Sequence, residues 1–148
     1  MRRVRIAEIN DVDLLVPLFD KYRQFYGRSS DEGLARTFLS ERLERRESVI
    51  FLAEQGGVAV GFIQLYPSFT SVGAARVWIL NDLYVDAAQR RNGAASMLLK
   101  AAAAFSRETG AVKLVLSTAV TNLPAQTLYE RHGWKRDDEF VEYALTMV

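Results

Sequence analysis

The chain has 148 residues, the usual length of a single domain, and we predict that residues 1–148 form one domain with its own apolar core. Its 19 Lys and Arg against 18 Asp and Glu leave a formal net charge of +1, which argues against nucleic-acid and anionic-membrane partners. Cysteine is absent, histidine occurs once and no run of about 18 apolar residues is present, so we expect a soluble, cytoplasmic protein without thiolate chemistry or a bound metal.

The first third of the chain predicts a short strand followed by two amphipathic helices. Val4, Ile6 and Ile9 indicate the strand, and the Asn-Asp pair that follows supplies capping chemistry for the first helix. Apolar side chains of that helix recur at spacings of three and four, and Gly27 ends it. A second helix begins at residues 29–31, where Ser-Ser-Asp offers a cap.

The middle of the chain changes to the period of β-strands. Residues 49–53 and 58–66, joined by a turn at 55–57, predict an antiparallel hairpin. After a loop at 67–73, the β-branched and aromatic residues of 76–85 predict a third strand.

The last third predicts a helix from 93 to about 109, a buried strand at 112–120, a short helix at 124–132 and a final alternating strand at 140–147. The core-facing side chains of the long helix are Ala94, Met97, Leu98, Ala101 and Phe105. The complete order is βααβββαβαβ. It predicts an α/β or α+β domain in which helices flank a mixed central sheet.

The junction between the strand at 76–85 and the long helix is the most informative segment. Its loop ends in Arg90-Arg91-Asn92, and the helix opens with four small residues at 93–96. A helix start offers unpaired N–H groups and the positive end of the helix dipole, so an anion site is one interpretation and an ordinary strand-to-helix turn is the other. The segment contains neither G-x-G-x-x-G nor G-x-x-x-x-G-K-[ST], which argues against a dinucleotide fold and a nucleoside triphosphatase.

Two motifs follow one another in the second half of the chain. Val85, Arg90, Gly93 and Ala95 match V-x-x-x-x-R-x-x-G-x-[GA], and residues 122–134 match N-x-x-A-x-x-x-Y-x-x-x-G-[FW]. In this order they resemble the motifs of the GNAT superfamily of acyl-CoA-dependent N-acyltransferases, and its polyamine, thialysine and histone-type branch in particular. The resemblance extends along essentially the whole chain. It implies the GNAT fold and an acetyl-CoA-dependent N-acetyltransferase.

The resemblance also implies where acetyl-CoA binds. The diphosphate would accept hydrogen bonds from backbone N–H groups of about 91–96, with added charge from Arg90. The pantetheine arm would pair with backbone groups at 83–85, where two parallel strands splay apart. The cofactor-binding set is Leu83, Tyr84, Val85, Arg90, Arg91, Asn92, Gly93, Ala94, Ala95, Ser96, Asn122, Ala125 and Tyr129, the last three at the thiol end.

Tyr129 and Asp82 are the candidate catalytic residues. The tyrosine at this place in the family is commonly assigned as the acid that protonates the leaving thiolate, and a phenol of pKa about 10 is protonated at neutral pH. An alkyl ammonium of pKa about 10.4 must lose a proton before it attacks, so a base or a water relay is useful. Asp82 would orient water or bind the ammonium, or would only cap a neighbouring backbone group. Strand alternation puts Asn81 and Asp82 on opposite faces unless a bulge intervenes.

Aromatic residues would shape the acceptor site, because an aromatic pocket near a carboxylate suits a cationic amine. The predicted substrate-binding residues are Tyr22, Tyr26, Trp78 and Asn81. Relatives in the polyamine and thialysine branch tend to carry Glu-Asp where this chain has Asn81-Asp82, so position 81 offers no carboxylate here. The acceptor is expected to be a primary amine of a small molecule or of a protein.

Two alternatives to an enzyme remain at this point: a non-catalytic acyl-CoA sensor, and a helix-terminus site for the phosphate of another nucleotide. The intact Tyr129 favours the enzyme, because a sensor needs no acid for a leaving group. The final strand at 140–147 would form a sheet edge, and edges invite pairing across a two-fold axis, so we expect a homodimer.

Overall fold

The computed structural model describes residues 2–90 and 93–148, so Arg91 and Asn92 of the predicted cofactor set lie outside the described residues. The chain forms two compact units, Met1–Ser117 and Thr118–Val148.

The first unit is built on a five-stranded mixed sheet in the order β1-β2-β3-β4-β5. Its strands are β1 (Arg2–Ile6), β2 (Val49–Gln55), β3 (Val58–Thr70), β4 (Ala75–Val85) and β5 (Ala111–Val115). The first four strands pair antiparallel with their neighbours, and β5 pairs parallel to β4. The mixed central sheet agrees with the predicted fold class.

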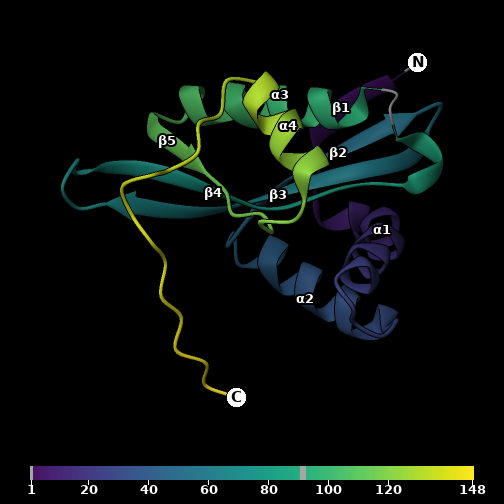
Figure 1. The fold of residues 1–148 in the computed structure, drawn as a ribbon. Helices are drawn as coiled ribbons and strands as arrows, with labels where there is room; N and C mark the ends of the chain where they lie inside the picture. The colour runs from purple at the N-terminus through teal and green to yellow at the C-terminus, as the bar shows by residue number, and fades with distance from the viewer. Residues whose placement is uncertain (1, 91–92) are drawn as a thin grey trace. The chain divides into compact units, whose positions relative to one another are not determined.

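Three α-helices cover the two faces of this sheet (Figure 1). α1 (Val12–Phe25) follows a short 3₁₀ turn, η1 (Ile9–Asp11), and lies with α2 (Glu32–Glu44) on one face. α3 (Ala94–Glu108) lies on the opposite face, after a second 3₁₀ turn, η2 (Ala87–Gln89).

Local sequence signals explain where these helices begin and end. The Asp31 carboxylate accepts a hydrogen bond from the Leu34 N–H at 3.0 Å, which caps α2 as its sequence predicts. Gly27 follows α1 with a φ of 85° and Gly110 follows α3 with a φ of 77°, a left-handed conformation that glycine adopts without strain. The predicted helix ends are therefore confirmed.

The core has one layer on each face of the sheet. On the α1 side, Phe62 of β3 packs against Phe19, with ring centroids 6.0 Å apart, and Leu15 and Leu39 are buried beside them. On the α3 side, Ala94 and Leu98 are buried as predicted. Leu99, Ala102 and Ser106 are buried as well, whereas Met97, Ala101 and Phe105 are half-buried.

Two strand boundaries differ from the prediction. β3 continues through residues 67–70, which the sequence assigns to a loop, because β4 pairs with β3 as far as Thr70 opposite Ala75. Pro67 is tolerated there because the β2 ladder on its other side has already ended at Leu65. β5 ends at Val115 instead of 120, and as the outer strand next to β4 it leaves Val112 64% exposed rather than buried.

The second unit contains α4 (Leu123–Arg131), and Asn122 caps it by accepting a hydrogen bond from the Ala125 N–H at 3.3 Å. Gly133, with a φ of 89°, follows the helix as predicted. The strand predicted at 140–147 is not formed. A strand needs a neighbour for its N–H and C=O groups, and none pairs with these residues within the described chain.

An ion-pair network fixes the start of the chain to the sheet and to η1. Arg5 donates two hydrogen bonds of 2.8 Å to the Asp11 carboxylate and a third of 2.9 Å to Glu54. Both carboxyl side chains are at most 10% exposed. The hydrogen bonds from Arg5 hold the pKa of Asp11 and that of Glu54 below their ordinary values.

We expect Asp11→Asn to lower the free energy of unfolding by about 1.5–3 kcal/mol at pH 7, because it leaves the Arg5 guanidinium partly unpaired. Since the pKa of Asp11 is depressed in the folded state, its contribution is complete well above pH 3.8, the ordinary pKa of an Asp, and is lost as the pH falls further. Urea titrations at pH 7 and pH 3 measure this difference. Asp13→Asn is the control, because Asp13 pairs with Arg36 while its side chain is 81% exposed, and it should change stability by no more than about 0.5 kcal/mol.

Candidate functional site

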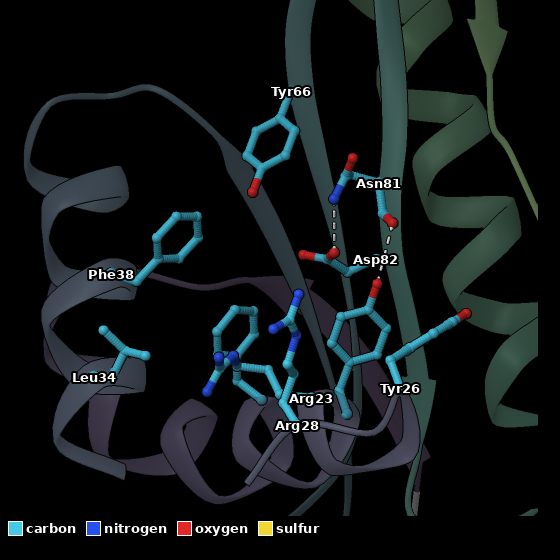
Figure 2. Close-up of a pocket in the computed structure, with 10 residues that line it drawn as sticks. Arg23, Tyr26, Arg28, Leu34, Phe38, Tyr66, Asn81 and Asp82 are labelled. Carbon is cyan, nitrogen blue, oxygen red and sulfur yellow. Dashed lines mark hydrogen bonds between the residues drawn. The ribbon is translucent and has the colours of Figure 1, made fainter. Parts of the chain in front are cut away.

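A pocket of about 380 Å³ lies in the first unit among α1, α2, β3 and β4. Figure 2 shows Asn81 and Asp82 projecting from the strand and the aromatic and basic side chains around them. The aromatic and apolar lining residues are Phe19, Tyr22, Tyr26, Leu34, Phe38 and Tyr66. The polar lining residues are Arg23, Arg28, Asn81 and Asp82. The pocket therefore contains Tyr22, Tyr26, Asn81 and Asp82, four of the predicted site residues.

A β-bulge in β4 brings Asn81 and Asp82 to the same pocket. Asp82 is opposite Gln64 and Leu80 is opposite Leu65, so Asn81 is an extra residue with no partner of its own on β3. An extra residue reverses the alternation of side chains beyond it. The sequence analysis required such a bulge for the Asn81 and Asp82 side chains to reach the same site, and β4 contains it.

Trp78, a predicted substrate-binding residue, lies outside this pocket because it precedes the bulge. Its ring lies 5.2 Å from that of Phe105 on α3, and its indole N–H donates to the Thr109 hydroxyl at 2.8 Å. Trp78 precedes the bulge and so faces α3, whereas Asp82 follows it and faces α1.

Asp82 is 3% exposed and held by amide donors. The Gln64 side-chain N–H donates to one carboxylate oxygen, and the Asn81 side-chain N–H donates to the other at 2.9 Å. Burial raises the pKa of Asp82, although the hydrogen bonds from Gln64 and Asn81 act in the opposite direction. A carboxyl group with a raised pKa is a stronger base than an exposed one, so Asp82 is suited to accept a proton from an ammonium group.

Two tyrosines stand beside this carboxyl group as neutral phenols. Burial and the charge of Asp82 raise the pKa of Tyr22, whose hydroxyl donates to the Asn81 carbonyl at 3.3 Å. The same two causes raise the pKa of Tyr66 to about 12. Both hydroxyl groups therefore remain donors at neutral pH.

Sequence reasoning missed Gln64, which is completely buried and donates to Asp82. Its signal in the sequence was a single amide side chain inside the apolar run of β3. A buried amide of this kind requires a partner, and its place opposite Asp82 depends on the register of β3 and β4.

The start of α3 has the features of an anion site. Gly93 caps the helix with a φ of 81°, and the first turn carries no acidic residue. A Cβ atom added at Gly93 would lie 3.4 Å from an Nη1 atom of Arg2, so this guanidinium faces the positive end of the helix. Two positive groups repel unless an anion lies between them. Arg2 was also missed by sequence reasoning.

The remaining residues of the predicted cofactor-binding set lie partly in the first unit and partly in the second. The β4–β5 ladder ends at Ile79 opposite Val115, so residues 83–85 pair only with β3 among the described strands. Arg90 folds back, with its Nε–H 3.0 Å from the Val85 carbonyl and its guanidinium over the ring of Tyr84. Ala94 is buried, and Ala95 and Ser96 are half-buried at the start of α3. In the second unit, Ala125 and Tyr129 lie one turn apart on α4.

Residues 15–134 match the family described as "Acetyltransferase (GNAT) family". The chain belongs to this family. It is 44% identical over 144 residues, 97% of each chain, to the uncharacterized N-acetyltransferase YhfO of Bacillus subtilis (strain 168). A crystal structure of a probable acetyltransferase has a TM-score of 0.94 and 47% identity, over 99% of this chain and 98% of that one. The aminoglycoside N-acetyltransferase AAC(6')-Iy in complex with CoA shares the fold, with a TM-score of 0.83 and 17% identity over 98% and 95% of the chains.

The GNAT membership confirms that the protein is an acetyl-CoA-dependent N-acetyltransferase and that it acts on an amine acceptor. It also confirms the predicted fold class, although the last predicted strand is not formed. No helix among the described residues is both long and apolar enough to cross a membrane. The roles of the individual site residues stay predictions.

We expect Gly93→Ala to weaken CoA binding by about tenfold, because the added Cβ stands at the helix start where the motif implies the diphosphate. Gly110→Ala is the matched control. It places the same left-handed strain, about 1–2 kcal/mol, at the other end of α3, where nothing lies within 4 Å of the added atom. Calorimetric titration with CoA and urea unfolding measure both variants. Equal CoA affinity in the two variants would remove the start of α3 from the cofactor site.

Proposed function

We propose that the protein transfers the acetyl group of acetyl-CoA directly to a primary amine bound in the pocket beside Asp82. The observation that supports this most is the buried Asp82 carboxyl group, brought by the bulge to a small aromatic pocket in a GNAT domain. Bound acetyl-CoA supplies an activated thioester, so the chain needs to provide positioning and proton transfer and no covalent nucleophile.

Asp82 takes up the proton that the acceptor ammonium must lose before its nitrogen forms the new bond to the acetyl carbon. Its raised pKa matches this role better than that of an exposed carboxyl group. Asn81 holds one oxygen of the carboxyl group through its side-chain N–H, and the Tyr22 hydroxyl fixes the Asn81 backbone. A water molecule between the amine and Asp82 would carry the same proton.

Tyr129 donates its hydroxyl proton to sulfur as the carbon–sulfur bond breaks. The resemblance of the second motif supports this role, together with the place of Tyr129 one turn beyond Ala125 on α4. Within its own unit, the Tyr129 ring lies 5.9 Å from Trp134. The remaining parts of the donor site are proposed as the motifs imply, including the diphosphate contacts at the start of α3.

A cytoplasmic location and a homodimer are proposed as well. The apolar side chains at the end of the chain, among them Tyr143 at 92% exposure and Leu145 at 82%, support pairing with a second copy.

We expect Tyr129→Phe to lower kcat by about 100-fold, because it removes one hydroxyl group and the acid for the leaving sulfur. Acetyl-CoA affinity and the midpoint of thermal unfolding should hardly change. A CoA-release assay gives kcat, and calorimetry gives the affinity. Tyr143→Phe is the matched control, because it removes a phenol hydroxyl from an exposed position in the same unit. Unchanged turnover in Tyr129→Phe would exclude this residue from the proton transfer.

We expect Asp82→Asn to lower kcat by about 100-fold at pH 7, because an amide cannot take up the proton of the ammonium. In the wild type, kcat should fall as the pH drops through the pKa of Asp82, which lies above the ordinary 3.8. The variant should lack this acidic limb, and a pH profile of kcat measures it. Glu47→Gln, which changes an exposed carboxyl group beyond α2, should keep the wild-type profile. A profile of Asp82→Asn that retains the wild-type limb would assign the base elsewhere.

A further inference from the structure

The pocket beside Asp82 carries more positive than negative charge. The guanidinium groups of Arg23 and Arg28 line it, against the single carboxyl group of Asp82. Figure 2 shows the two arginines at the α1 side, whereas Asn81 and Asp82 project from the strand side. An acceptor with ammonium groups at both ends would place one of them against the arginines.

The Arg23 side chain has an N–H group that makes no hydrogen bond within the described residues. Its Nη1 atom is buried and makes no hydrogen bond to any residue that the structure describes. Asp20 attracts Arg23 by charge, but its carboxylate is occupied by the Ser30 hydroxyl at 2.6 Å and the Asp31 N–H at 2.7 Å. A buried N–H group without a partner is unfavourable, so Arg23, which lines the pocket, would be stabilised by a side-chain movement that brings this group to an acceptor atom of a ligand.

The end of α1 explains why the two arginines lie together. The Arg28 N–H donates to the Arg23 carbonyl at 3.0 Å and the Gly27 N–H donates to the Gln24 carbonyl at 2.9 Å, the two bonds of a Schellman motif. The left-handed Gly27 turns the chain back so that Arg28 returns toward Arg23. Neither arginine takes part in an ion pair within the described chain.

The wall next to the arginines is apolar. The rings of Phe19 and Phe38 are stacked with centroids 5.7 Å apart, and Leu34 lines the same pocket although it is 50% exposed. A volume of about 380 Å³ is near the lower end of the usual range of small-molecule sites, about 300–1,000 Å³. The pocket thus suits one small ligand with an apolar part.

We propose that the acceptor is an amino acid with an apolar side chain, whose carboxylate binds Arg23 and Arg28 and whose amine faces Asp82. A guanidinium group binds a carboxylate through two parallel N–H donors, and two such groups fix its orientation. The apolar side chain packs against Phe19, Leu34 and Phe38. This rests on the proposed function, because it takes the pocket as the acceptor site. Polyamines and aminoglycosides lack the carboxylate and are expected to be poor acceptors.

The test compares L-phenylalanine, L-phenylalanine amide and phenethylamine as acceptors, which differ in the carboxylate and share the aromatic side chain. We expect kcat/KM for phenylalanine to exceed that for either analogue by about tenfold or more. Arg23→Met should lower kcat/KM at least about tenfold for phenylalanine and by less than about threefold for phenethylamine. Arg28→Met should show the same selectivity and serves if the first variant fails to fold. Arg36→Met, on the exposed side of α2, is the control and should change neither value.

Equal kcat/KM for the three acceptors, or an equal loss for all of them in Arg23→Met, would overturn the carboxylate site. Turnover of phenethylamine or spermidine in preference to phenylalanine would keep the proposed function and reject this inference. If no amine is acetylated, calorimetric titration with phenylalanine decides. Binding that Arg23→Met weakens about tenfold supports the carboxylate site while the proposed function fails, and no binding rejects both.

Discussion

Asp82 lies almost completely buried in the middle of the sheet, where an ionised carboxylate is costly to remove from water. The Gln64 amide is what makes this position tolerable, because it is also buried and donates directly to the carboxylate. Gln64 lies on β3 and Asp82 on β4, so this hydrogen bond forms only in the observed register of the two strands. A slip by one residue would separate the two polar groups and leave the completely buried Gln64 side chain without its acceptor.

The bulge at Asn81 allows the hydrogen bond between Gln64 and Asp82, and it leaves Asn81 without a partner residue on β3. Without it, the side chain at position 82 would continue on the α3 side with Trp78 and Leu80, inside the apolar layer. With it, the carboxyl group crosses to the α1 side, where Tyr22 and Tyr66 supply polar neighbours at the edge of a pocket. The chemical character of the pocket therefore follows from a single backbone irregularity.

Local signals in the sequence were sufficient for most helices and strands, since caps such as Asp31 and left-handed glycines such as Gly27 act within one turn. Features that depend on a partner strand could not be located in this way. The place of the bulge is defined only by the register of β4 with β3, and the continuation of β3 through Pro67 depends on pairing with β4. A strand at 140–147 requires a neighbouring strand that the described residues do not supply. Arg23 and Arg28 were hidden for a similar reason, because only the turn at Gly27 brings two ordinary helix-end arginines into one pocket.

Although the net charge is only +1, positively charged groups are clustered on each face of the sheet. Arg2 stands at the positive end of α3 on one face, and Arg23 and Arg28 stand at the end of α1 on the other. Coulomb repulsion between such groups falls further when an anion binds, so each cluster favours a ligand with negative charge. A phosphorylated donor and a carboxylate-bearing acceptor would each neutralise one cluster. In the proposed site, Asp82 then remains as the negative group for the acceptor ammonium, so the charge pattern would favour one acceptor orientation as well as the proposed acceptor class.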